Sequence, residues 1–88
     1  MFDLSIIIVT YNNLKYTKEC ITELKKYSNS SYEIIMVDNG SSDETVEYIK
    51  SVANKYILND KNEGFAKAVN QGLALADSKY ICWLNNDL

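Results

Sequence analysis

Four groups of polar residues stand directly after short apolar runs, and they hold the side chains best suited to chemistry. The groups are Thr10-Tyr11-Asn12, Asp38-Asn39-Gly40, Asn59-Asp60-Lys61-Asn62 and Asn85-Asn86-Asp87. Their carboxylates and amides can accept hydrogen bonds from a polar ligand, and carboxylate oxygens can hold a hard divalent cation. If the groups meet in the fold, they predict a binding site that combines an aromatic ring with two carboxylates.

The elements that would bring these groups together alternate along the chain. Short β-branched runs predict four strands, and amphipathic spacing predicts three helices. In chain order the expected elements are strand 4–9, helix 14–27, strand 32–37, helix 43–53, strand 55–58, helix 65–76 and strand 80–84. A helix in every crossover favours parallel strands, so the predicted fold class is α/β. The polar groups then share the carboxyl edge of the sheet, where such folds bind ligands.

The same pattern predicts how the second and third helices begin and pack. Ser41 and Glu44 fit a capping box at the start of the second helix. Gly72 is expected to permit close packing of the third helix against the sheet. The residues of the third helix expected to point inward are Phe65, Val69, Leu73 and Ala76.

Composition excludes several classes of function. The 88 residues include no His and no Arg and carry a formal net charge of −3, which excludes histidine chemistry and argues against general nucleic-acid binding. The 3 glycines form neither a dinucleotide-binding nor a P-loop pattern. Cys20 and Cys82, far apart in apolar surroundings, predict buried free thiols. No run approaches the roughly 20 apolar residues of a membrane helix, and no signal-peptide pattern occurs, so we expect a cytoplasmic protein.

Four stretches together resemble the inverting glycosyltransferases of family 2. They are SIIIVTYN at 5–12, VDNGSSDET at 37–45, NEGFAKAVNQG at 62–72 and WLNND at 83–87. The resemblance implies a three-layer GT-A fold, with strand order 3-2-1-4 and helices on both faces of the sheet. Residues 1–88 would then form only the nucleotide-sugar-binding half of such a domain. The N-x-D form of the last stretch is frequent in rhamnosyltransferase-like branches.

A candidate nucleotide site follows from the first two polar groups. The Asp38 carboxylate can accept an N–H from a base edge, or it can cap its own turn. The resemblance implies the first role. It also implies that the Tyr11 ring lies against the base, whereas the alternative is an amphipathic tyrosine at the edge of the sheet with no ligand. Thr10 and Asn12 can face the nucleotide through their backbone, although Asn12 can equally cap the following helix. Asn39 is assigned to the same site.

A diphosphate leaving group needs positive charge as the glycosidic bond breaks, and a divalent cation can supply it. The resemblance implies that Asp87, the last residue of a D-x-D-like motif, holds Mn²⁺ or Mg²⁺, with Asn85 in place of the first carboxylate. A polar turn after the last strand is the alternative for both residues. Lys67 can reach a phosphate as a point charge, or it can remain on a solvated helix face.

The resemblance implies the donor-binding portion of an inverting hexosyltransferase. Its expected partners are a UDP- or dTDP-sugar and, in the full enzyme at the inner face of the membrane, an acceptor glycan or lipid-linked glycan. The general base and the acceptor site would lie outside these residues, so we expect no transfer by this chain alone. Strand 80–84 would form an open apolar edge, from which we expect self-association.

Other functions compete with this interpretation. A non-catalytic nucleotide-binding or assembly module would bind nucleotide weakly without chemistry, and it is the main alternative. A signalling receiver domain needs an acidic pair after the first strand, and Thr10-Tyr11-Asn12 lacks one. A nucleotidyltransferase needs a glycine-rich loop with a basic residue at the same place, which is also absent.

Overall fold

Strands and helices alternate along the chain as the sequence pattern predicts. The computed structural model describes residues 2–12, 14–27, 31–42 and 44–85. Its elements are β1 (Leu4–Thr10), α1 (Leu14–Tyr27), β2 (Tyr32–Asp38), α2 (Thr45–Val52), β3 (Lys55–Leu58), α3 (Phe65–Leu75) and β4 (Tyr80–Asn85). This order confirms the α/β class. None of the helices in the described ranges is long and apolar enough to cross a membrane.

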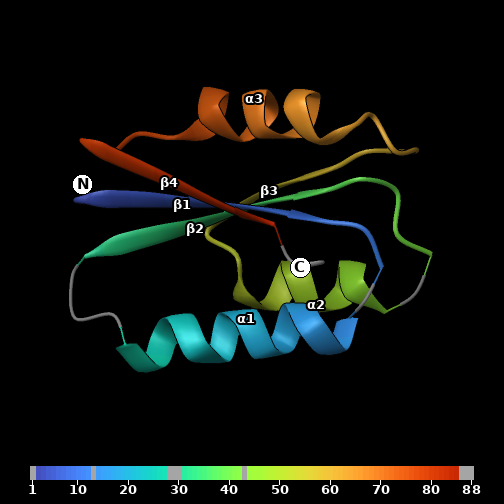
Figure 1. Ribbon diagram of the computed structural model, residues 1–88, viewed down its shortest axis with the longest axis horizontal. Coiled ribbons are helices and arrows are strands. Elements are labelled where there is room, and N and C mark those ends of the chain that lie inside the picture. The colour runs from blue at the N-terminus through green and yellow to red at the C-terminus, as the bar shows by residue number, and fades with distance from the viewer. Residues whose placement is uncertain (1, 13, 28–30, 43, 86–88) are drawn as a thin grey trace.

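The strands form one parallel sheet in the order β3-β2-β1-β4, which confirms the expected order. β1 pairs with β2 over its whole length, so that Thr10 lies opposite Asp38. On its other side β1 pairs with β4, and Val9 lies opposite Asn85. α3 covers one face of the sheet while α1 and α2 cover the other (Figure 1). The fold therefore has the three layers that were expected.

The two central strands supply most of the core because both of their faces are covered. The cluster on the side of α1 and α2 consists of Ile6, Ile8, Ile21, Ile34, Met36 and Ile49. The smaller cluster on the side of α3 consists of Val9, Val37 and Ala68. Such near-continuous apolar runs are typical of parallel strands buried on both faces.

α3 packs on the sheet through small residues. Ala68 and Gly72 are its buried residues, and a Cβ atom on Gly72 would lie only 2.6 Å from Cγ2 of Ile7. This contact confirms the close packing predicted for Gly72. Phe65 and Leu73 are exposed, so the prediction that both point inward is wrong. The helix lies too close to the sheet for large side chains to fit between the two layers.

α2 does not begin with the predicted capping box. Its N-cap is Glu44, which makes no side-chain capping hydrogen bond. The Ser41 hydroxyl instead donates to Asp38 and accepts from the backbone of Asn12. The prediction fails because groups outside the helix already engage this hydroxyl.

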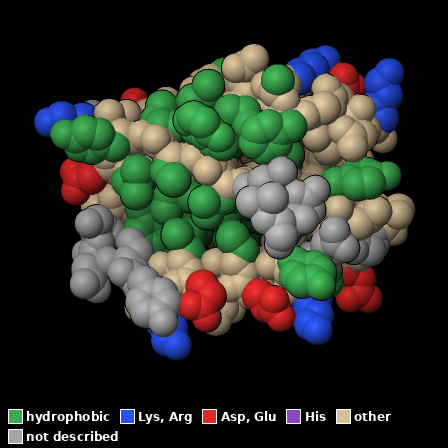
Figure 2. All heavy atoms as spheres, in the orientation of Figure 1, with side chains coloured by type: hydrophobic (Ala, Val, Ile, Leu, Met, Phe, Trp, Pro, Cys, Tyr) green, Lys and Arg blue, Asp and Glu red, His purple; other side chains and the backbone are tan. Residues whose placement is uncertain are grey.

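β4 forms an edge of the sheet with much of its apolar surface exposed. Within the described part of the chain it pairs only with β1, and Ile81 and Trp83 are 41% and 55% exposed. Cys82 is exposed as well, which corrects the predicted burial of this thiol, whereas Cys20 is half-buried and both thiols are free. The edge position of the strand explains the exposure. Figure 2 shows hydrophobic side chains gathered across the middle of one face of the molecule, between α3 and α1.

A buried carboxylate holds the amino edge of the sheet. The Oε2 atom of Glu33 accepts hydrogen bonds from the Ser5 hydroxyl at 2.6 Å and the Asp77 N–H at 3.2 Å. Its Oε1 atom pairs with Lys55 Nζ at 3.2 Å, and Nζ also donates to the Leu75 carbonyl at 2.8 Å. Burial by itself raises the pKa of Glu33, but these hydrogen bonds and the Lys55 charge outweigh it and lower the pKa. We call this group the amino-edge cluster.

We expect the amino-edge cluster to make stability depend on pH. Because the pKa of Glu33 is lower in the folded chain, its contribution to the free energy of unfolding is fully present above the ordinary value of 4.5. That contribution is lost as the pH falls through the lowered pKa. Near neutral pH, Glu33→Gln should lower the free energy of unfolding by about 2 kcal/mol, because hydrogen bonds to a charged group are lost.

Urea unfolding at neutral pH and at acidic pH measures both effects. Glu23→Gln is the matched control, since Glu23 lies on the exposed side of α1. The variant Glu33→Gln should lose less stability on acidification than the wild type or this control does. The same acid dependence in all three proteins would contradict the prediction.

Candidate functional site

The carboxyl edge of the sheet gathers the ends of β1, β2 and β4. Thr10 and Asp38 end neighbouring strands and lie opposite each other. On the other side of β1, the last residue of β4, Asn85, lies opposite Val9. The direction of the chain crossovers reverses between β1 and β4, and open parallel sheets bind ligands at such a switch point. The loop after β1 therefore occupies the centre of the candidate site.

Hydrogen-bond donors surround the Asp38 carboxylate, and the residue is only 1% exposed. Its Oδ1 atom accepts from the Thr10 hydroxyl at 2.9 Å and from the Ser41 hydroxyl. Its Oδ2 atom accepts the backbone N–H groups of Gly40 at 3.2 Å and Ser41 at 2.8 Å. These four donors match the roughly four acceptor positions of a carboxylate. Asp38 thus organises its own turn, and a base could contact it only by replacing one of the donors.

Ser41 joins the loop after β2 to the loop after β1. Its hydroxyl oxygen accepts the Asn12 N–H at 2.7 Å, and Oδ1 of Asn12 accepts the Ser42 N–H at 2.8 Å. Asn12 has a φ of 54°, a backbone conformation that Asn adopts more readily than most residues. Ser41 was not predicted as a site residue, because the sequence pattern fits its side chain to a helix cap. The turn-forming residues from Asp38 to Ser41 are the sequence feature that could have identified Ser41 as part of the site.

Tyr11 contributes an accessible aromatic surface beside this buried carboxylate. The residue is 48% exposed and directly follows Thr10, which is fully buried. Thr10 therefore acts on the site through its hydroxyl bond to Asp38, whereas the Tyr11 ring is free to stack on a planar ligand.

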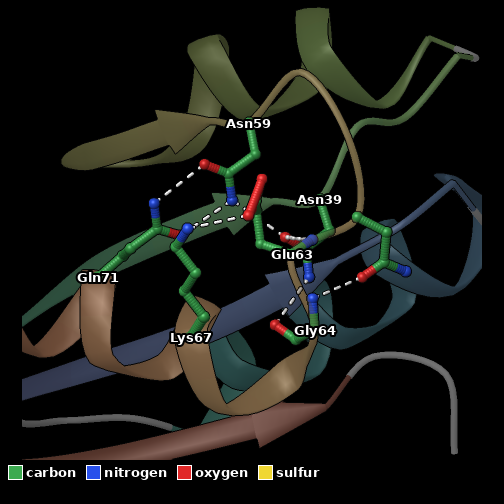
Figure 3. A network of polar contacts seen from close by, with 7 residues as sticks. Asn39, Asn59, Glu63, Gly64, Lys67 and Gln71 are labelled. Atoms are coloured by element: carbon green, nitrogen blue, oxygen red, sulfur yellow. Dashed lines mark hydrogen bonds and ion pairs between the residues drawn. The ribbon is translucent and has the colours of Figure 1, made fainter.

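Asn39 ties the loop after β2 to the loop after β3 (Figure 3). Its Nδ2 atom donates to the Gly64 carbonyl at 3.3 Å, and its Oδ1 atom accepts from Asn59 Nδ2 at 3.0 Å and the Glu63 N–H at 3.3 Å. The side chains of Asn59 and Gln71 form two further amide hydrogen bonds, of 2.9 and 3.0 Å. Asn39 therefore holds the β3–α3 loop, and sequence reasoning identified neither Asn59 nor Gln71 as part of this network.

The two loops also pack closely on each other at Gly40. Its φ is 87°, and a Cβ atom there would lie 2.9 Å from the Lys61 Cα atom. Both the positive φ and the close backbone contact favour glycine at this position. The backbone of the β2–α2 loop thus packs directly on that of the β3–α3 loop.

Lys67 lies in the first turn of α3 and points toward Glu63 (Figure 3). The distance from its Nζ atom to Glu63 Oε1 is 2.9 Å. The hydrogen bond and charge of Lys67 lower the pKa of Glu63. Exposed ion pairs of this kind are weak, so a phosphate group can compete with Glu63 for the ammonium group.

One of the two predicted metal ligands lies at the end of β4. Asn85 is the last residue of that strand, whereas Asp87 lies outside the described residues. The ranges that the structure describes contain no cluster of three or more His, Cys, Asp or Glu side chains that could hold a metal ion. The amide oxygen of Asn85 and the carboxylate of Asp87 are hard donors, so their chemistry fits Mn²⁺ or Mg²⁺.

Comparison with known proteins agrees with this geometry. The family model described as Glycosyl transferase family 2 matches residues 5–88. Glycosyltransferase GlyG of Streptococcus pneumoniae serotype 4 is 32% identical over an alignment of 89 positions, which covers 96% of this chain and 30% of GlyG. The chain spans between 12% and 30% of the length of the curated relatives that it matches.

Solved structures show the same fold. The mannosyltransferase PcManGT from Pyrobaculum calidifontis, in complex with GDP-Man and Mn²⁺, has a TM-score of 0.83 at 20% identity, over 99% of this chain and 30% of that one. Glucosyl-3-phosphoglycerate synthase from Mycobacterium tuberculosis, in complex with Mn²⁺, UDP and glucosyl-3-phosphoglycerate, has a TM-score of 0.79 at 17% identity, over 99% and 34%. These likenesses confirm the GT-A arrangement. Since the family model covers nearly all of its length, the chain belongs to glycosyl transferase family 2.

Proposed function

We propose that this chain is the donor-binding part of an inverting glycosyltransferase that transfers a hexosyl group from a nucleotide-diphosphate-sugar to an acceptor hydroxyl. The observation that carries the proposal is the convergence of Thr10, Asp38 and Asn85 at the carboxyl edge, around the switch point between β1 and β4. Membership of family 2 supports it. Two structures of the same fold hold GDP-Man or UDP together with Mn²⁺.

The base and ribose lie against the loops after β1 and β2 in this proposal. The exposed ring of Tyr11 stacks on the base, and Asp38 accepts an N–H of the base edge. Thr10 donates its hydroxyl to Asp38, while Asn12 fixes Ser41 through its backbone N–H. Thr10 and Asn12 thereby hold the two nucleotide-binding loops in position.

The diphosphate lies toward α3 and the end of β4. Asn39 fixes the β3–α3 loop, and Lys67 exchanges Glu63 for a phosphate oxygen. Asp87 and Asn85 hold Mn²⁺ or Mg²⁺. When bound, this cation supplies positive charge to the diphosphate as the glycosidic bond breaks.

The remaining parts of the proposal concern the full enzyme. Because the chain spans only 30% of the length of GlyG, we propose that it binds the donor without transferring it. The donor is a UDP- or dTDP-sugar, because the imide N–H of uracil or thymine suits Asp38. The acceptor is a glycan or lipid-linked glycan at the inner face of the membrane. Two free thiols accord with a cytoplasmic setting.

Titration with UDP and with dTDP, in the presence and absence of Mn²⁺, tests the donor site. We expect a Kd on the order of millimolar or tighter that decreases further with Mn²⁺. Asp38→Ala should weaken the binding of both nucleotides about ten-fold under either condition, because it removes the acceptor for the base. Asp87→Ala should abolish only the effect of Mn²⁺.

Asp3→Ala provides the control, since Asp3 is exposed and precedes β1 at the opposite edge of the sheet. It should bind both nucleotides as the wild type does. If the wild-type chain binds neither nucleotide at millimolar concentration, the proposed donor site is wrong.

The open edge of β4 favours a second candidate function, a non-catalytic assembly module. The outer side of an edge strand presents N–H and C=O groups to which another strand can add. The exposed Ile81 and Trp83 lie on the same strand, and exposed apolar patches commonly mark interaction surfaces. We propose that a second copy of the chain pairs through this edge.

Light scattering over a range of concentrations tests this association. We expect the apparent mass to rise from monomer toward dimer, and Trp83→Lys should shift that rise to higher concentration because it places a charge in the apolar interface. Tyr16→Lys is the control, since Tyr16 is similarly exposed but lies on α1. A monomeric wild type at high concentration would refute the association.

A further inference from the structure

The surroundings of Asp38 leave one donor that a ligand can replace. Thr10 is fully buried, whereas Gly40 and Ser41 are partly exposed. The donors at Oδ2 are the backbone N–H groups of Gly40 and Ser41, which cannot leave unless the turn itself unfolds. The Ser41 hydroxyl at Oδ1 is therefore the donor that an incoming group can displace.

The Ser41 oxygen remains in place when its proton turns away from Asp38. Its Oγ atom accepts the Asn12 N–H at 2.7 Å, and its backbone N–H donates to Asp38 Oδ2 at 2.8 Å. A serine hydroxyl has one proton, which rotates to suit its surroundings. If a ligand N–H occupies Oδ1, the hydroxyl proton is free to reach an acceptor next to that N–H.

We propose that Ser41 is a specificity-determining residue that recognises, together with Asp38, an N–H group flanked by a carbonyl. This inference rests on the proposed donor site. The base N–H replaces the Ser41 O–H at Asp38 Oδ1, and the Ser41 O–H donates to the adjacent base carbonyl. Each buried donor and acceptor thus keeps a partner, which avoids the cost of an unpaired polar group.

The proposed pair fits the imide edge of uracil and thymine and rejects cytosine in the same pose. Cytosine has an unprotonated ring nitrogen where uracil has its N–H, so this nitrogen would face the Asp38 carboxylate without a proton between them. Sites built to hydrogen-bond a ligand discriminate strongly against analogues that leave their polar groups unpaired. Ser41 adds to this discrimination through the C4 carbonyl of uracil or thymine, because cytosine carries an amino group there that cannot accept a hydrogen bond from the Ser41 O–H.

The ratio of the Kd values for CDP and UDP tests the inference. The two ligands share ribose and diphosphate and differ only at the base. We expect the wild type to bind UDP about ten-fold more tightly than CDP. Ser41→Ala should weaken UDP binding about five-fold, the value of one hydrogen bond, and leave CDP binding nearly unchanged. Ser41→Thr keeps the hydroxyl and should retain the wild-type ratio.

Ser51→Ala is the matched control, because the Ser51 hydroxyl is exposed and bonds only the preceding turn of α2. Equal losses of UDP and CDP affinity in Ser41→Ala would show that Ser41 merely holds the loop, and would overturn the inference. A wild type that binds both ligands equally would overturn it too, while leaving donor binding intact. Failure of the wild type to bind either ligand would refute the donor site as well. If Ser41→Ala does not fold, Ser41→Cys replaces it, with the same expected fall in the ratio.

Discussion

The parallel pairing of β1 with β2 is the constraint on which the candidate site depends. It sets Thr10 opposite Asp38 and brings the threonine hydroxyl within 2.9 Å of the carboxylate. A slip of one residue would send one of these side chains to the other face of the sheet. The apolar residues that precede them prevent such a slip, because Ile8 and Met36 are fully buried partners in the same register. Packing in the core thus decides where the carboxylate lies.

The two edges of the sheet accommodate a buried carboxylate in different ways. At the amino edge Glu33 pairs with the Lys55 ammonium, and loss of Lys55 would leave the buried carboxylate without its cation, at high cost. At the carboxyl edge the four donors found around Asp38 are neutral hydroxyl and N–H groups. A neutral donor can be exchanged for another with little change in free energy. The amino edge is therefore suited to hold the fold together, and the carboxyl edge is suited to exchange a ligand.

Sequence reasoning located the carboxyl edge correctly, because strand periodicity and the family resemblance together place Thr10 and Asp38 at neighbouring strand ends. It did not identify the network of Asn39, Asn59 and Gln71. Side-chain amides follow no regular spacing in the sequence from which such a network could be predicted. These three side chains come from separate segments that meet only after the sheet and α3 have packed.

The exposure of Leu73 on α3 and of Trp83 on β4 has one physical origin. The apolar pattern shows which side chains favour burial, but the spacing of the layers decides which of them obtain it. α3 packs on β1, β2 and β3, and Gly72 brings it so close to Ile7 that the larger Leu73 is left exposed. The same placement leaves Trp83 uncovered on β4. The position of one helix thus accounts for the close packing that supports the β3–α3 loop and for the exposure of Trp83, whereas the strand order makes β4 an edge of the sheet.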